Sequence, residues 1–434
     1  MNQKFQQVRK LSAIALAIGA LYGFGGTAAA QYVSNVSQSG ADNEASVLQQ
    51  NYFGGLQTVT IDQNGNGNNA TAEQLNSGQS SQTILQNGDA NDGRILQFRQ
   101  AGASAAINQV GTANSAYIEQ TWLLGSSASV TQGGSANSGR IFQIPPVAPG
   151  LDPRADYSSA RINQQGASNV ATINQVGVNT SGPGNGAQAS IDQIGGNFNN
   201  ATINQNPDSQ RASAAIFQGN GANSNSAVVN QTGPDHQASV TQAQNGFGGV
   251  QGSTALVTQT GSAQSAVSDQ RAGGGSSVTI LQSGDGNNAN ATQVTFNSSI
   301  TVNQAGSANS ANVSQNLALS TTASVLQTGD ANVANVNQGT TINENNNQAH
   351  VTQTGTGNNA SVSQGAPGTS GQANFNEATI LQNGSANLAT ITQRGLGVGG
   401  NPNTASVTQS GFGNVAHVTQ GGGAGNHATV VQNP

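Results

Sequence analysis

The chain has 434 residues, of which only 6% are charged and 4% aromatic, and it contains 58 glycines and no cysteine. This composition excludes disulfides, thiolate metal sites and an ordinary core of large side chains. After residue 30 there are eight arginines and no lysine against 17 acidic residues, and this net charge of −9 argues against a nucleic-acid partner.

The chain begins with a segment typical of a secretory signal peptide. Three basic residues precede an apolar run over 11–21, and three alanines end the segment at residue 30. The run is too short to cross a membrane, which takes about 20 consecutive apolar residues. We therefore expect residues 1–30 to be removed and a secreted mature chain over 31–434 that has no membrane span.

One short frame, Ala-x-φ-x-Gln, recurs along the mature chain, where φ is a core-sized side chain. It occurs 32 times; φ is Val or Ile in 29 copies and never Leu, and the leading position is Ala in 25. Alternation with period two places Ala, φ and Gln on one face of a β-strand, and β-branched side chains favour a strand. The expected core therefore includes Ile107, Ile118, Val313, Val336, Val407 and Val418.

The frames come in pairs. Fifteen of the 31 intervals between frame glutamines are eleven residues, as in residues 405–420, ASVTQSGFGNVAHVTQ. The Gly-x-x-Asn linker supplies residues that accept positive φ, so each pair predicts strand–turn–strand. A unit of about 23 residues lies in the period range of solenoids. We predict an all-β, two-strand-per-coil β-solenoid with cross-β-like stacking and about sixteen units.

Amide side chains at fixed frame positions predict ladders between the stacked coils. The frame glutamine can donate to and accept from the glutamine of the next layer, and an asparagine six residues before the second glutamine of a pair can do the same at the turn. The expected ladder residues are Gln38, Gln49, Gln86, Gln97, Gln109, Gln120, Gln304, Gln315, Gln327, Gln338, Gln409, Gln420, Asn114, Asn309, Asn332 and Asn414.

Longer linkers interrupt the array, and we expect these insertions to keep to one edge of the stack. The first contains four prolines, which lack the amide proton of a ladder and must leave the stack. Between Gln175 and Gln259 the eleven-residue intervals change from odd-numbered to even-numbered strands, which predicts one unpaired or miscounted strand and a locally defective coil. The linkers lie near 144–159, 177–187, 243–253, 339–347, 365–376 and 395–403.

Titratable residues form no recognisable catalytic, metal or cofactor motif, so we expect no enzyme. Histidines 350 and 417 fall on the outward face, His236 takes an asparagine position and His427 falls in a turn; all four are interpreted as solvated. Three arginines are interpreted as outward surface charge, with acidic polysaccharide as a second possibility: Arg94, Arg140 and Arg161. Three turn aspartates are interpreted as charges that slow lateral β-pairing, not as calcium ligands: Asp89, Asp285 and Asp330.

The stretch from Gln109 to Gln120, QVGTANSAYIEQ, resembles the curlin repeat, and the resemblance extends over residues 34–432. Curlins are the subunits of curli, the extracellular amyloid fibres of bacterial biofilms. The resemblance implies export in unfolded form with a curli-type secretion pore and chaperones. It also implies polymerisation, with a nucleator subunit, into adhesive fibres at the cell surface, and it assigns ladder roles to Gln109, Gln120, Gln409, Gln420, Asn114 and Asn414.

Two functions stay open from the sequence. The first is a subunit that polymerises with itself into a fibre, favoured by a frame that is complete as far as Gln432 with no capping repeat, which soluble repeat proteins need. The alternative is a monomeric secreted solenoid that binds ice, carbohydrate or a host surface. Regular threonine columns would favour the alternative, but outward positions mix types such as Thr408, Leu48 and Glu119.

Overall fold

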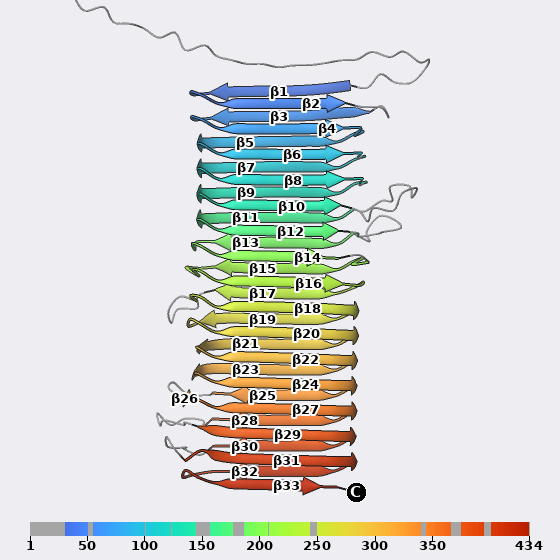
Figure 1. Ribbon diagram of the computed structural model, residues 1–434, viewed down its shortest axis with the longest axis vertical. Helices are drawn as coiled ribbons and strands as arrows, with labels where there is room; N and C mark the ends of the chain where they lie inside the picture. The colour runs from blue at the N-terminus through green and yellow to red at the C-terminus, as the bar shows by residue number, and fades with distance from the viewer. Residues whose placement is uncertain are drawn as a thin grey trace, which may run out of the picture.

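In the computed structural model the chain forms a stack of parallel β-strands in two sheets that face each other (Figure 1). The secondary structure in the part of the chain that the structure describes is all β, and it contains no helix that could cross a membrane. The expected signal peptide, residues 1–30, lies outside the described residues. The structure describes residues 31–50, 55–99, 101–122, 124–144, 157–176, 186–206, 208–243, 250–339, 344–365, 375–394 and 401–433.

The two sheets are named A and B, and the chain alternates between them. Sheet A has 17 strands: β1 (Gln31–Ser39), β3 (Leu56–Asn64), β5 (Ser81–Asp89), β7 (Ser104–Thr112), β9 (Ser127–Ser135), β11 (Ser159–Ala167), β13 (Gln188–Ile194), β15 (Ser213–Gly219), β17 (Gln237–Ala243), β19 (Ser265–Ala272), β21 (Asn288–Phe296), β23 (Ser310–Leu319), β25 (Val333–Gln338), the short β26 (Glu344–Asn345), β28 (Asn359–Gln364), β30 (Leu388–Gln393) and β32 (Val415–Gln420).

Sheet B has 16 strands: β2 (Glu44–Gln50), β4 (Asn69–Leu75), β6 (Asp92–Phe98), β8 (Ser115–Thr121), β10 (Ser138–Ile144), β12 (Val170–Val176), β14 (Asn200–Gln205), β16 (Ser226–Thr232), β18 (Thr254–Ser262), β20 (Ser277–Asp285), β22 (Ser299–Ser307), β24 (Thr322–Asp330), β27 (Gln348–Thr356), β29 (Asn376–Ser385), β31 (Asn403–Phe412) and β33 (His427–Gln432).

Each strand pairs in parallel with the strand one coil earlier and one coil later in the same sheet, so like residues stand above like residues. Between β14 and β16, for example, alanine faces alanine, Ile203 faces Val229 and Gln205 faces Gln231. The register shifts only after the frame glutamines of β19 and β21, where irregularities interrupt the ladders. The predicted all-β, two-strand-per-coil β-solenoid is therefore confirmed.

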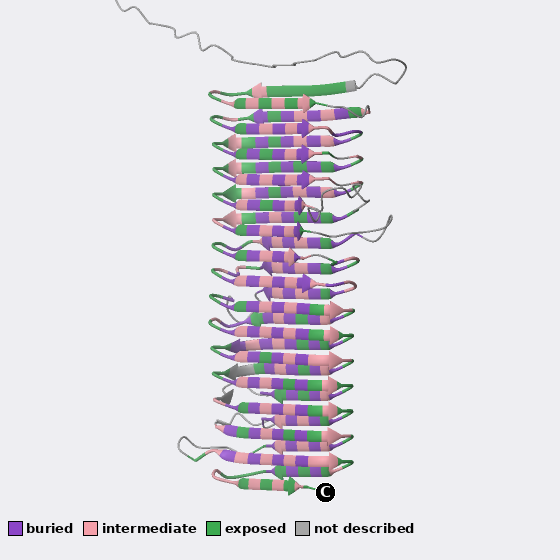
Figure 2. Ribbon diagram, turned by 45° about the vertical axis from the view of Figure 1, so that its right-hand side comes forward, coloured by how far each residue is buried: buried purple, intermediate pink, exposed green. Residues whose placement is uncertain are grey.

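The core between the sheets is thin because each small position meets large ones on the opposite strand. A Cβ built on Gly93, at an alanine position of the frame, would lie 3.1 Å from Ile84 Cγ2 and 3.2 Å from Gln86 Nε2. Even an alanine at this position would require Ile84 or Gln86 to shift slightly, so the sheets lie close together there. All six expected core residues are buried in the single apolar cluster, and Figure 2 shows the alternation of buried and less buried positions along the strands.

Each coil has two edges where the chain passes between the sheets, from A to B and from B to A. The shorter connections, called tight arcs, lie at one edge in the first half of the solenoid and at the other edge in the second half. From Gly40 to Gly166 a glycine column follows sheet A strands, at the A-to-B edge; from Gly233 to Gly411 it follows sheet B strands, at the B-to-A edge. In both columns a Cβ would overlap the carbonyl oxygen of the next layer. The prediction of an unpaired strand between Gln175 and Gln259 is wrong, because every strand there is paired and only the tight edge changes.

The expectation that insertions keep to one edge is wrong for the same reason. The linkers after β10 and β12 join sheet B to sheet A, whereas those after β17, β25, β28 and β30 join sheet A to sheet B. In each case the longer linker lies at the edge that lacks the glycine column. The column has no space for extra residues, so insertions accumulate opposite it. The proline-rich segment 145–156 itself lies outside the described residues.

The two glycines of one turn provide a test of this steric constraint. Gly284 has φ +99° and its added Cβ would overlap Gly306 O, whereas Gly286 has φ +63° and open space around it. We expect Gly284→Ala to lower the local free energy of unfolding by about 3 kcal/mol, and the control Gly286→Ala by about 1 kcal/mol. Hydrogen exchange of the amides of β20 to β24 measures both. Equal effects would contradict the constraint.

Candidate functional site

Two columns of glutamine amides run through the interior of the stack, one in each sheet. Each glutamine Nε2 donates to Oε1 of the glutamine one layer toward the C-terminus, with nitrogen–oxygen distances between 2.6 and 3.1 Å. In sheet A the chain of bonds runs from Gln38 to Gln420. In sheet B it runs from Gln49 to Gln432.

Backbone carbonyls fix the direction of these ladders. Gln109 Nε2 also lies 2.9 Å from Asp92 O and 3.0 Å from Asn114 O, so the nitrogen, and not the oxygen, must face these acceptors. The same arrangement recurs at the other inward glutamines, for example Gln304 with Asn288 O at 3.0 Å. Both ladders therefore have a donor end and an acceptor end, and both point the same way along the stack.

Asparagines form a third ladder at the tight edge. Asn114 Nδ2 donates to Asn91 Oδ1 of the previous layer at 3.1 Å and to Gly134 O of the next layer at 3.1 Å. At the other edge, Asn332 repeats the pattern with Asn309 Oδ1 at 3.1 Å and Gly355 O at 2.9 Å. Asparagine thus ties each arc to the glycine column of its neighbours, and the structure brings all four predicted asparagines into these ladders.

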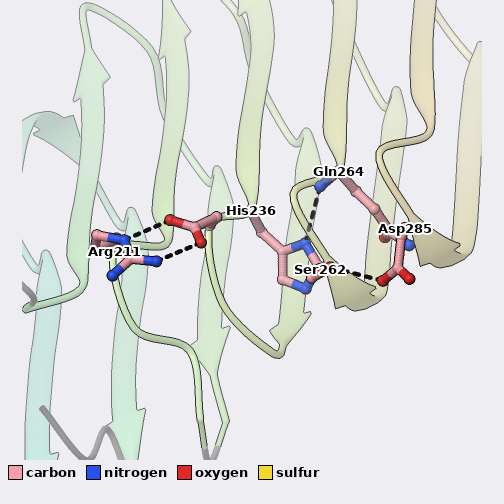
Figure 3. Close-up of polar contacts among 6 residues, drawn as sticks. Arg211, His236, Ser262, Gln264 and Asp285 are labelled. Carbon is pink, nitrogen blue, oxygen red and sulfur yellow. Dashed lines mark hydrogen bonds and ion pairs between the residues drawn. The ribbon is translucent and has the colours of Figure 1, made fainter. Parts of the chain in front are cut away.

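A histidine takes the asparagine position beside Gly233, where the second glycine column begins. His236 is fully buried, its Nε2 lies 3.0 Å from Thr232 O, and its Nδ1 accepts from the Gln264 backbone N–H at 3.4 Å (Figure 3). One neutral tautomer satisfies both contacts. Burial is the main cause that lowers the pKa of His236, against the ring's hydrogen bond to Thr232, which raises it. The interpretation of this histidine as solvated is wrong, because it occupies a buried amide position.

Ion pairs and carboxylates link neighbouring arcs. Beside His236, Arg211 holds Asp235 through two 2.6 Å bonds, which lowers the pKa of that carboxyl group. Asp89 accepts from the Asn66 backbone at 2.8 Å, and Asp330 from the Ser307 backbone at 3.0 Å. Spacing alone did not show that the turn aspartates serve as acceptors for the preceding layer. Among the described residues, no group of three or more His, Asp or Glu side chains is arranged to hold a metal.

The outward face of sheet B carries a cluster of aromatic and charged side chains between β4 and β10. Arg94 bonds Glu73 at 3.0 Å and lies 5.9 Å from the Tyr117 ring centroid. Tyr117 donates its hydroxyl to Glu119 at 2.8 Å and packs against Phe142. Burial and then the Glu119 hydrogen bond raise the pKa of Tyr117 to about 12. Arg94 is thus a partner of neighbouring side chains and not simply solvated charge.

The predicted glutamines occupy the ladder as a set, but not in equal environments. Those inside the stack are buried, whereas Gln38 and Gln49 in the first coil are only partly buried. His427 begins β33 and is exposed, instead of lying in a turn. The ladders therefore run the length of the solenoid and reach the surface at its two ends.

Removing one glutamine from the middle of the ladder tests its contribution. We expect Gln304→Met to lower the local free energy of unfolding by about 3 kcal/mol, because Gln282 Nε2 and Gln327 Oε1 both lose a buried partner. Gln348→Met is the control, since Gln348 is exposed at the start of β27 in the same sheet. Hydrogen exchange of the flanking layers reports the difference. If the ladder did not contribute to stability, the two variants would show the same local free energy of unfolding.

His236 should make the middle of the stack sensitive to acid. In the unfolded chain its ring takes up a proton near pH 6.5, whereas in the folded chain its pKa is lowered, so the unfolded state binds more protons below that pH. Stability is then complete above about pH 6.5 and falls as the pH decreases. We expect His236→Asn, which restores the column's usual residue, to flatten this dependence. Urea unfolding monitored at β16–β19 from pH 7.5 to 5.5 measures the free energy of unfolding. If it fell with pH at the same slope in wild type and His236→Asn, His236 would not be the cause of the acid sensitivity.

The repeat can now be compared with known proteins. A family model described as the curlin associated repeat matches residues 372–397 and 400–433, which contain the frames of β29 to β33. No curated protein matches the chain. The matched frames stand in register with those of the preceding layers, where the same inward alanine, φ and glutamine recur. Residues 372–433 therefore match the curlin associated repeat, and the preceding layers repeat the same frame.

Proposed function

We propose that the chain is a secreted structural subunit that polymerises into extracellular curli-like amyloid fibres for biofilm matrix and adhesion. The observation that carries this proposal is the state of the outermost strands. Among the described residues, β1 and β2 pair on one side only, with β3 and β4, and β32 and β33 pair only with β30 and β31. Each end of the stack therefore offers two unpaired strand edges, which are templates for further strands.

The inward positions of the end coils support the same conclusion. Val36 is 40% exposed, although its equivalents Ile61 and Ile84 in the next layers are at most 1% exposed. Val47 and Val430 are likewise only partly buried against the core. Figure 2 shows β1 mostly exposed and β33 with no buried position. Another layer on each end would cover these side chains and pair their backbones, as inside the stack.

The outward faces do not favour the alternative, a monomeric binding module. A surface that matches ice or a regular glycan needs one residue type repeated in every layer. In sheet B the outward position before the frame glutamine is Glu73, Leu96 and Glu119 in successive layers. The longest run of one residue type at this position, Asn174, Asn204 and Asn230, covers three layers. The described residues show no positive catalytic feature. A structural subunit remains the function that the geometry supports best.

The family also suggests how the proposed fibre reaches its place. We propose that residues 1–30 direct export, that a curli-type secretion pore and chaperones keep the chain unfolded until it leaves the cell, and that a nucleator subunit starts the fibre. The absence of cysteine suits this route, because no disulfide has to form on the way.

Purified mature chain, residues 31–434, tests the proposal directly. We expect it to assemble from an unfolded state into fibres that bind amyloid dyes and give a reflection near 4.8 Å. X-ray fibre diffraction and dye fluorescence measure both. A chain that folded and stayed monomeric, and bound glycans or inhibited ice recrystallisation, would support the alternative instead.

A further inference from the structure

The two ends of the solenoid differ in the polar groups that they present. At the C-terminal end, Gln420 Nε2 bonds the carbonyls of Thr404 and Asn426 but, among the described residues, no glutamine of a further layer. At the N-terminal end, Gln38 and Gln49 donate inward to Gln63 and Gln74, which leaves their Oε1 atoms on the outer side. Gln49 Oε1 also accepts from Ser34 Oγ at 2.6 Å, and a carbonyl oxygen has a second lone pair for a donor of a further layer. The C-terminal end therefore presents ladder donors, and the N-terminal end presents ladder acceptors.

A second copy can continue the stack in one orientation only. If its β1 follows β32 and its β2 follows β33, the parallel register places Gln38 after Gln420 and Gln49 after Gln432. Joining two like ends would require one copy to be turned over, so the strands would run antiparallel. Glutamine would then no longer face glutamine. Two C-terminal ends would place ladder donors against donors, and two N-terminal ends would place acceptors against acceptors. The amide ladders therefore favour a joint between unlike ends.

The same register brings one pair of titratable residues together. His427 is the first residue of β33 and Glu44 the first residue of β2; both are exposed and both stand five positions before the frame glutamine. Adjacent strands lie about 4.8 Å apart, so the two side chains would be neighbours across the joint. Thr404 Oγ1 lies 2.5 Å from His427 Nδ1, so when this hydroxyl donates, the Nε2–H of the ring can bond a carboxylate in the following layer.

Few other charges face this pair. On the N-terminal side, Glu44 stands over Asn69, with Asp42 in the preceding turn and Asp92 one layer further inside. On the C-terminal side, His427 stands over Thr404, with Glu377 one layer further inside; His417 lies on β32, in the other sheet. The cluster around Glu44 is acidic, which favours a basic partner across the joint.

We propose that copies of this chain join head to tail in continuing register, with the C-terminal coil of one copy against the N-terminal coil of the next and His427 opposite Glu44. This inference rests on the proposed polymerisation and adds its orientation and its contact residues. The asparagine ladder continues across the same joint, because Asn426 precedes β33 as Asn43 precedes β2. The fibre is therefore polar, and a copy adds to each end in one orientation.

Charge reversal at the joint provides the test. The rate of elongation of sonicated fibre seeds by monomer of the same variant is measured for wild type, His427→Glu and Glu44→Lys/His427→Glu. We expect His427→Glu, which opposes two carboxylates, to elongate about tenfold more slowly. The double variant opposes lysine to glutamate, and its rate should return to within about threefold of wild type. His350→Glu is the matched control, because His350 lies on an outward position of β27 with Ser324 and Thr379 as neighbours.

The outcomes separate the joint from the proposed function. Wild-type chain that forms no fibre would overturn both. Fibres in which His427→Glu elongates as fast as His350→Glu, or in which the double variant is not rescued, would overturn the His427–Glu44 joint and leave polymerisation standing. Rescue by the second charge change also shows that the single variant was not simply unfolded, since both variants carry the same His427→Glu substitution.

Discussion

A buried primary amide must find both a donor and an acceptor, and in this protein the inward glutamine finds them in the same side chain one layer away. That constraint governs the rest of the structure. It requires parallel strands in register, because a shift of one residue would turn the glutamine to the outward face and a shift of two would place it beside the φ position. Each bond contributes only about 1 kcal/mol net. The cost of leaving an amide unpaired is larger, so the ladders contribute more to the choice of register than to stability.

The arcs impose a second constraint, which decides where the chain can vary. Glycine carbonyls in one layer lie against glycine Cα atoms in the next, and asparagine amides bond across them, so the tight edge cannot accept extra residues. Longer linkers occur only at the opposite edge. Buried side-chain polar atoms without a hydrogen-bond partner among the described residues are scattered along the stack, for example at Gln57, Asn163, Ser253 and Asn376. Where the tight edge changes side, the described strands from β12 to β18 all remain paired.

The strands, their pairing and the ladder positions could be predicted from the sequence because they depend on short-range periodicity. Alternation of alanine, valine or isoleucine, and glutamine defines a face whatever the rest of the chain does. The change of edge could not be read in the same way, since the spacing between glutamines does not say which sheet a strand joins. Contacts such as Arg211–Asp235 join residues 24 positions apart, and they form only because the two turns lie in neighbouring layers of the stack. His236 was misjudged because histidine is polar, although its asparagine position already indicated burial.

The same interactions that hold one layer on another also describe what an end layer lacks. The Nε2 of an interior glutamine such as Gln393 reaches Glu377 O, Asn403 O and the next glutamine. Among the described residues, Gln420 Nε2 reaches only two carbonyls. Water can solvate the remaining donor, but Val430 in the last described layer is only partly buried. In the proposed fibre a second copy bonds the donor and covers this valine. If the proposed fibre forms, stacking within the chain and stacking between chains therefore use the same interactions.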